Sequence, residues 1–277
     1  MHSLPRAAKI YLVGVYLAGI LTFASAGLVG LSRLHASAWE PGLFLLLALL
    51  AGGKKVCLMR HKSMEDVGSI SLGFAITFAA IVRFGPVMGM LVGAVSMISA
   101  GLYPKVQPLH QLAFNVALNA FQAWVAGWVF VYASMGMGNV GPIAVTGGAI
   151  AATLIYFAIN TGGVAIIIGL CTHQCPLSLW KTNFLWMAPT YFAAAGISTL
   201  AMFLFGQHSG FMLVLIAPVI FLTYHSYAVY AARAEEKQQH IEELQLSQAQ
   251  LADLYLATIK SLALAIDAKD QYTHQHI

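Results

Sequence analysis

The sequence predicts an all-α protein: a polytopic transmembrane helix bundle of about eight spans, followed by a cytoplasmic helix. Of its 277 residues, 59% are hydrophobic and 9% are charged, whereas a soluble domain carries about 25% charged residues. No Asp or Glu lies between Asp66 and Glu235, a stretch that could cross a bilayer several times at about 20 residues per helix. After Tyr230 the composition changes to Glu, Gln, Ala and Leu. The chain is therefore divided into a membrane region, residues 1–232, and a polar tail.

Long apolar segments predict the individual spans. They occupy residues 10–32, 38–53, 69–84, 86–102, 111–133, 142–171, 183–206 and 211–232. The second, third and fourth are short for a hydrocarbon layer of about 30 Å, so they could be re-entrant or shielded by neighbouring helices.

The distribution of Lys and Arg predicts the orientation, because cytoplasmic loops are enriched in both. With the N-terminus inside, nine basic residues flank cytoplasmic ends: Arg6, Lys9, Lys54, Lys55, Arg60, Lys62, Lys105, Lys181 and Arg233. Arg33 and Arg83 fall on the outer side. We expect both termini to be cytoplasmic, and we expect Arg83 to extend to the outer interface because the membrane region offers it no acidic partner.

The tail predicts a soluble helix. Position a of a heptad repeat would hold Ile241, Gln248, Tyr255 and Leu262, and position d would hold Leu244, Leu251, Thr258 and Ala265. Such a 3.5-residue repeat is typical of a parallel coiled-coil dimer. An amphipathic helix that packs on its own domain explains the pattern equally well.

The last two dozen residues, LYLATIKSLALAIDAKDQYTHQHI, contain Asp270, Tyr272, Thr273 and His276 in the pattern D-x-Y-T-x-x-H. This segment resembles the opening of the HD-GYP domain, a bacterial metal-dependent phosphodiesterase. The family commonly has Pro at the position of Gln271 and Gly at that of Gln275. By the resemblance, residues 233–261 form a helical linker and residues 262–277 form the truncated start of an HD-GYP domain.

The resemblance implies a function for His276 as a ligand of a di-metal centre, of the iron or manganese type, that hydrolyses cyclic di-GMP. The remaining ligands are not in these 277 residues, so we expect this chain to be inactive even where the full-length protein is a phosphodiesterase. An alternative is that His274 and His276 belong to a disordered tail. Cys171, His173 and Cys175 are a weaker metal site, because structural zinc needs four ligands.

The membrane region resembles the MASE-type sensory regions that precede cyclic-di-GMP output domains, in the segments GSISLGFAITFAAIVRFGPVMGMLVGAVSMI, FNVALNAFQAWVAGWVF, INTGG and LWKTNFLWMAPTYF. This resemblance implies a multi-pass protein of the bacterial inner membrane, a signalling role for the tail helix, and a homodimer formed through it. The segment FGPVMGMLVGAV is also similar to a helix of vitamin-binding transporter subunits. A small-molecule transporter subunit and a plain membrane anchor therefore remain alternatives to a sensor.

The candidate ligand site is a row of amides, because Asn115, Asn119 and Gln122 recur at helical spacing on one face of a span that also carries Trp124. Together with Asn160 of the next span they could form the polar floor of an aromatic pocket for a small or lipophilic ligand. The same amides could instead only fasten the two helices by hydrogen bonds. Basic residues at the ends of spans do not form the single basic face of a nucleic-acid-binding protein, so the expected partners are the lipid bilayer and a small molecule.

Glycines predict close helix contacts. Gly85, Gly89 and Gly93 share one helical face, which favours packing against another backbone. Gly162 and Gly163 predict either close packing or a hinge in the sixth span.

Overall fold

The structure is a computed structural model, and it describes residues 4–29, 39–52, 55–57, 69–71, 73–103, 106–136, 141–205, 236 and 238–264. The chain divides into two compact units, Met1–Ser226 and Tyr227–Ile277. Each unit is treated by itself. The boundary lies close to the predicted limit of the membrane region at residue 232.

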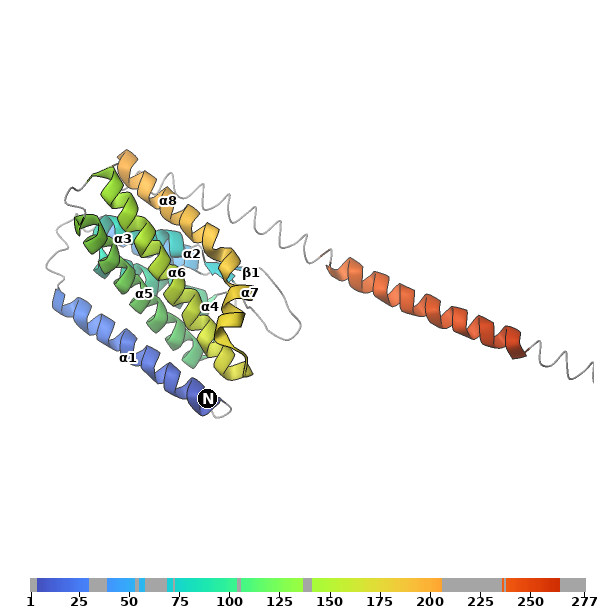
Figure 1. Cartoon of the computed structure of the whole chain (residues 1–277). Coiled ribbons are helices and arrows are strands. Elements are labelled where there is room, and N and C mark those ends of the chain that lie inside the picture. The colour runs from blue at the N-terminus through green and yellow to red at the C-terminus, as the bar shows by residue number, and fades with distance from the viewer. Residues whose placement is uncertain are drawn as a thin grey trace, which may run out of the picture. The chain divides into compact units, whose positions relative to one another are not determined.

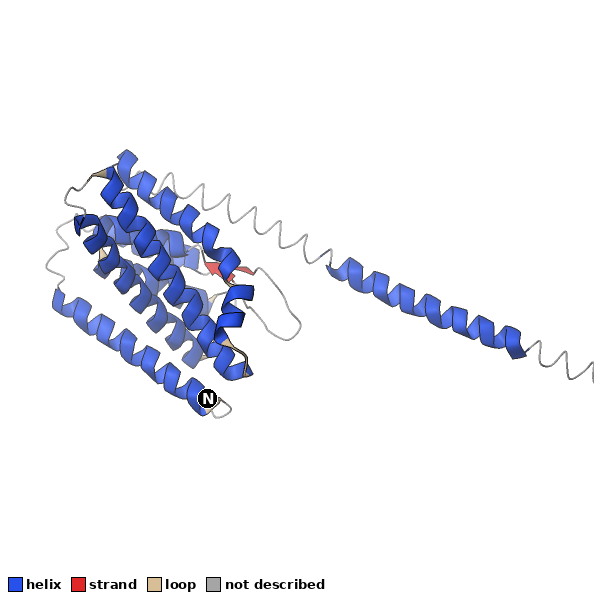
Figure 2. Ribbon diagram, viewed as in Figure 1, coloured by secondary structure: helices blue, strands red, loops and turns tan. Residues whose placement is uncertain are grey.

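The first unit is helical apart from one short strand pair (Figures 1 and 2). Its elements are α1 Arg6–Val29, α2 Trp39–Gly52, β1 Lys55–Cys57, β2 Ser69–Ser71, α3 Gly73–Phe84, α4 Pro86–Leu102, α5 Leu109–Gly136, α6 Pro142–Thr172, α7 Pro176–Asn183, the 3-10 turn η2 Leu185–Met187 and α8 Ala188–Phe205. The strands β1 and β2 pair antiparallel, with Val56 opposite Ile70. Apart from this pair and the turns, the described residues of the unit are helical, in agreement with the predicted all-α class.

Proline sets the start of three helices. Pro86, Pro142 and Pro176 each occupy the first turn of their helix, where the missing N–H costs no hydrogen bond. The helix α6 ends at His173, which adopts the left-handed conformation (φ 56°) and donates its N–H to Gly169 O. Helix α6 is continuous from Pro142 to Thr172, so Gly162 and Gly163 do not interrupt it.

Cys175 stands immediately before α7 and is exposed. Backbone hydrogen bonds from Ser178 and Leu177 lower the pKa of its thiol, because N–H groups at a helix start stabilise the thiolate. Cys171, at the end of α6, is half-buried and is also a free thiol.

Helix α5 lies at the centre of the bundle, packed between α4 and α6 and against α1, whereas α3 packs on α4 and α8 (Figure 1). The largest apolar core joins α3, α5, α6 and α8 through Phe78, Ala123, Ala152 and Ala195. A second core joins α2, α3 and α4 around Phe44, Ala79 and Val92. Small side chains at these contacts let the backbones approach closely, as is typical of helices in membranes.

The predicted glycine face of α4 is confirmed as a packing face at two of its three positions. A Cβ at Gly89 would collide with Ile81 of α3, and a Cβ at Gly93 would collide with Asn119 Oδ1 of α5. A Cβ at Gly85 would meet no atom within 4 Å, but Gly85 has φ 86°, which favours glycine. Helix α4 therefore lies close to both neighbours because these side chains are missing.

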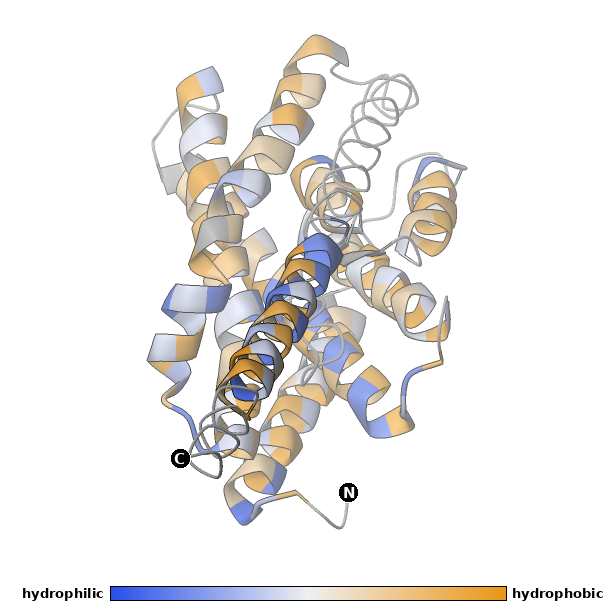
Figure 3. Cartoon of the chain, turned by 90° about the vertical axis from the view of Figure 1, so that its right-hand side faces the viewer, coloured by the Kyte–Doolittle hydropathy of each residue, from blue (hydrophilic) through white to orange (hydrophobic). Residues whose placement is uncertain are grey.

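Three described helices, α1, α5 and α6, are long and apolar enough to cross a membrane. Helices α7 and α8 add a fourth if they form one span with a bend of 64° between them. Helices α2, α3 and α4 coincide with the three predicted short segments but are shorter than a full crossing. The predicted segment 211–232 lies outside the described residues. Figure 3 shows hydrophobic residues, in orange, along most of these helices, mixed with paler residues and with some hydrophilic ones, in blue.

The prediction for Arg83 is wrong in one respect, because the membrane region does supply an acidic partner. Arg83 Nη2 lies 3.4 Å from Glu40 Oε2, and the Glu40 side chain is 9% exposed. The Arg83 guanidinium also lies 5.6 Å from the ring centroid of Phe84. Glu40 lies in the first turn of α2 and Arg83 in the last turn of α3, so packing of these two helices brings together charges that are distant in sequence.

In the second unit, residues 238–264 form a helix, as predicted for the tail. Figure 3 shows hydrophilic and hydrophobic residues alternating along it. Its apolar side chains are exposed within the single chain, with Ile241 at 48%, Leu244 at 51% and Leu251 at 50%. These three belong to the predicted heptad seam. The predicted start of the HD-GYP domain lies almost entirely outside the described residues.

Candidate functional site

Five neutral polar side chains gather inside the apolar bundle, and we call them the polar cluster. Helix α5 supplies Asn119 and Gln122, α6 supplies Tyr156 and Asn160, and α8 supplies Tyr191. Asn119, Gln122, Tyr156 and Tyr191 are buried, with exposed fractions of 5%, 0%, 1% and 6%, and Asn160 is half-buried. The cluster thus lies near the middle of α5, where water cannot satisfy its hydrogen bonds.

Hydrogen bonds link the cluster across three helices. The Tyr156 hydroxyl donates to Asn119 Oδ1 at 3.4 Å, which joins α6 to α5. Asn160 Nδ2 donates to the Tyr191 hydroxyl at 2.6 Å, which joins α6 to α8. The rings of Tyr156 and Tyr191 are 6.3 Å apart, so the two hydrogen-bonded pairs are neighbours.

Aromatic rings surround the cluster. The ring centroid of Phe74, on α3, lies 4.8 Å from that of Tyr156 and 4.5 Å from that of Tyr191. Phe157 packs edge-on to Tyr191 at 5.2 Å. A few polar groups inside an aromatic wall are the usual composition of a site for a small organic ligand.

Gln122 differs from its neighbours in the cluster. Its amide approaches the Tyr156 hydroxyl closely enough to interact with it, but neither its side-chain nitrogen nor its oxygen reaches the geometry of a formed hydrogen bond with any described residue. A fully buried amide without partners costs about 1–3 kcal/mol. Gln122 therefore offers one acceptor and two donors to a bound molecule.

The side chains of the cluster are hydrogen-bonding groups that carry no charge near neutral pH. Amides and tyrosine hydroxyls are neutral hydrogen-bonding groups, and a general base needs a pKa near the working pH. Among the residues that the structure describes, no three His, Cys, Asp or Glu side chains gather to hold a metal ion, and this includes Cys171, His173 and Cys175. His276, the predicted ligand of the di-metal centre, lies outside the described residues.

Of the five predicted ligand-binding residues, the structure brings Asn119, Gln122 and Asn160 into the cluster. Asn115 shares their side of the bundle but donates to Gln107 Oε1 at 3.1 Å, in the connection before α5. Trp124 packs elsewhere, with Ala26, Met90 and Ala120. It follows Gln122 by two residues, a rotation of about 200° around the helix, so it points to a different side of α5.

Sequence reasoning missed Tyr156 and Tyr191, which connect the amides. A signal was present, because a tyrosine inside an apolar helix needs a hydrogen-bond partner for its hydroxyl. Which partner it takes depends on how α6 and α8 pack, and that is not visible in the spacing of either helix.

Neighbouring polar contacts fasten the short helix α7 to the same region. Trp180 Nε1 donates to Thr161 Oγ1 at 2.8 Å, and the Trp180 ring lies 6.0 Å from that of Phe157. Thr161 is on α6, one residue after Asn160. Helix α6 therefore connects the polar cluster to α7.

Comparison with protein-family models, curated proteins and solved structures finds no match to this chain.

Proposed function

We propose that this chain is a membrane-embedded sensor, the input region of an HD-GYP cyclic di-GMP phosphodiesterase of the bacterial inner membrane. The observation that carries the proposal is the polar cluster, in which the buried amide of Gln122 makes no well-formed hydrogen bond with a described residue. A buried amide of this kind destabilises the empty bundle, and a ligand that satisfies it gains the same free energy on binding. The ligand we propose is a small, uncharged and largely apolar molecule with one amide, carbonyl or hydroxyl group.

The tail supports the proposed output. Residues 238–264 are helical, their seam residues are exposed, and the next residues carry the D-x-Y-T-x-x-H pattern that resembles the start of an HD-GYP domain. A parallel homodimer would bury this seam. In the proposal a ligand shifts the bundle between two states, and the tail helix transmits the shift to the output domain.

The proposed topology has about eight spans with both termini in the cytoplasm, supported by the distribution of Lys and Arg. A reporter fused after Gly138 should behave as periplasmic, and one fused after Gln239 should behave as cytoplasmic. Reporters on the same side would show that the number of spans between the two positions is even rather than odd.

A transporter subunit is the second candidate, and it is supported only by the glycine face of α4. Gly89 and Gly93 of that face are occupied by close contacts with Ile81 and Asn119, so the face has no space for a substrate at these two positions. A plain membrane anchor is the third candidate. It differs from a sensor in one respect: changes in the polar cluster would have no effect on the output.

The test uses the whole 277-residue chain, joined in frame to the rest of an HD-GYP domain. Gln122→Leu removes both amide groups while conserving volume, and Gln111→Leu is the matched control, because Gln111 is exposed on the same helix. Gln122→Leu should change the rate of cyclic di-GMP hydrolysis per molecule about fivefold or more, the usual lower range of coupling between sites. The control should leave it unchanged. Equal rates for all three proteins at equal abundance would refute the sensor and leave the anchor.

A further inference from the structure

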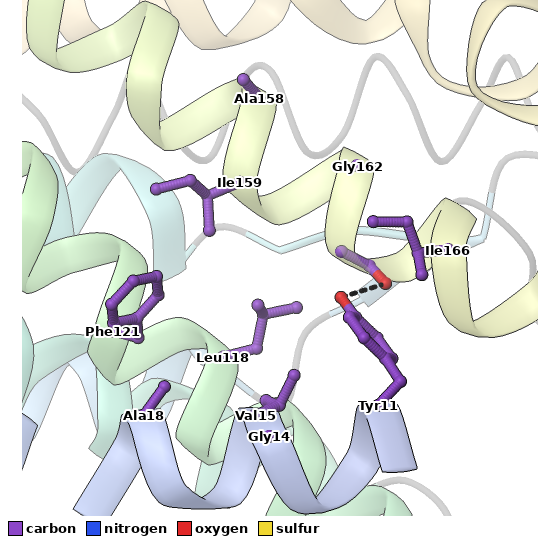
Figure 4. A pocket seen from close by; sticks show the side chains of 11 residues that line it. Tyr11, Gly14, Val15, Ala18, Leu118, Phe121, Ala158, Ile159, Gly162 and Ile166 are labelled. Atoms are coloured by element: carbon purple, nitrogen blue, oxygen red, sulfur yellow. Dashed lines mark hydrogen bonds between the residues drawn. The ribbon is translucent and has the colours of Figure 1, made fainter. Parts of the chain in front are cut away.

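A groove on the bundle runs between α1, α5 and α6, apart from the polar cluster, and we call it the α1 groove. It encloses about 400 Å³. Figure 4 shows Leu118, Phe121 and Ile159 pointing into the space between α1 and α6. All three helices are long and apolar enough to cross a membrane, so lipid would surround the groove. We propose that the α1 groove holds part of one acyl chain of an anionic membrane phospholipid.

The walls of the groove select an apolar occupant. The hydroxyl of Tyr11 is the one polar side-chain group in the lining, and it donates to Gly163 O at 3.1 Å. Water is held in cavities by two to four polar partners, which these walls do not provide. Hydrocarbon fills such a space at no cost in lost hydrogen bonds.

Two glycines create the space. A Cβ at Gly14 or at Gly162 would meet no atom within 4 Å. Elsewhere along α1 the helices touch, because a Cβ at Gly19 would lie 2.7 Å from Ala117 Cβ. The Tyr11–Gly163 hydrogen bond thus joins α1 to α6 at one end of this stretch, and the contact of Gly19 with Ala117 joins α1 to α5 at the other.

The length of the groove fits a segment of one chain. Tyr11 and Ala18 mark its two ends on α1, about 10 Å apart at 1.5 Å per residue. That is about one third of a hydrocarbon layer of 30 Å, so the rest of the chain and the headgroup would lie beyond the groove.

Charge at the Tyr11 end indicates the headgroup. Arg6 and Lys9 lie within two turns of Tyr11 on α1, and α1, α5 and α6 contain no Asp or Glu. The positive N-terminal end of α1 adds to this potential. An anionic phosphate headgroup is therefore favoured over a zwitterionic one.

The test measures phospholipid retained by the purified full chain, using native mass spectrometry after exchange into bilayers of equal parts phosphatidylglycerol and phosphatidylcholine. Wild type should retain phosphatidylglycerol in preference. Gly14→Leu and Gly162→Leu fill the groove and should each lower retention about fivefold or more, whereas Gly27→Leu and Gly196→Leu should not. The two controls are matched, because a Cβ at either position also meets no atom within 4 Å and neither glycine lines the groove.

Several results would overturn the proposal. Unchanged retention in both groove-filled variants would place the lipid elsewhere, and retention of a free fatty acid or an isoprenoid instead would refute the phospholipid. The double variant Arg6→Gln, Lys9→Gln should lose the preference for phosphatidylglycerol. Adding Gly14→Leu to this double variant should still lower the amount of phospholipid retained. Equal retention of both phospholipids by wild type would refute the headgroup contact.

Discussion

Gly93 of α4 lies against Asn119 of the polar cluster, and the variant Gly93→Ala tests this contact. The new methyl group would collide with Asn119 Oδ1, and it would stand 3.3 Å from Thr77 Cγ2 and 3.6 Å from Ala123 Cβ. Asn119 must then move, which breaks its 3.4 Å hydrogen bond with Tyr156.

The expected free-energy change has two opposing parts. Overpacking a tight contact costs about 1–3 kcal/mol, and replacing glycine inside a helix contributes about 0.5–1 kcal/mol of stability. Gly93→Ala should therefore lower the free energy of unfolding by up to about 2 kcal/mol. Gly196→Ala is the control, because its Cβ would meet no atom within 4 Å, and it should be neutral or stabilising.

A double-mutant cycle isolates the contact. Asn119→Ala alone loses a membrane hydrogen bond, worth about 0.6 kcal/mol on average. In the double variant the obstructing oxygen is gone, so the protein should be about 1–2 kcal/mol more stable than the sum of the two single losses predicts. Reversible unfolding in mixed micelles measures all four proteins. Additive losses would refute the packing of Gly93 in α4 against Asn119 in α5.

Two further predictions concern single side chains. Because backbone N–H groups at the start of α7 lower the pKa of the exposed Cys175 thiol, maleimide should label Cys175 faster than Cys171 at pH 7. As the pH is lowered, the labelling rate of Cys175 should decrease at a lower pH than the labelling rate of an ordinary thiol does. Labelling that follows pH as for an unperturbed thiol would contradict this. Tyr191→Phe leaves Asn160 without its 2.6 Å hydrogen bond and should lower the free energy of unfolding by about 0.6–1.7 kcal/mol. Tyr132→Phe, at a position 66% exposed, should not, and equal effects would contradict the hydrogen bond.

The sequence predicted the helices better than their contacts. Apolar segments indicated α2, α3 and α4 with small errors at their ends, because hydropathy is a local property. The short β1–β2 pair was missed, since three residues in each strand give no periodicity. Lengths alone could not settle how many segments cross the membrane, because α2 to α4 are too short to cross fully by themselves.

Part of the candidate site was also accessible to sequence reasoning. Asn119 and Gln122 were found because polar residues three apart in an apolar helix share a face. Tyr156, the hydrogen-bond partner of Asn119, was missed because it lies 37 residues away from Asn119. The pairing of Arg83 with Glu40 was missed for the same reason, at a separation of 43 residues.

Disulfide crosslinking of the tail tests most directly whether the membrane bundle controls a dimeric output helix. The three native cysteines are first replaced by serine, and single cysteines are then placed at Leu244, Leu251, Glu242 or Gln239 in the full chain. The two seam positions should crosslink between protomers much faster than Glu242 and Gln239, which lie at outward heptad positions. If the cluster biases the state of the bundle as proposed, Gln122→Leu should change the ratio of seam to outward rates. Equal rates at all four positions would contradict the dimer, and a seam pattern unaffected by Gln122→Leu would contradict the sensor.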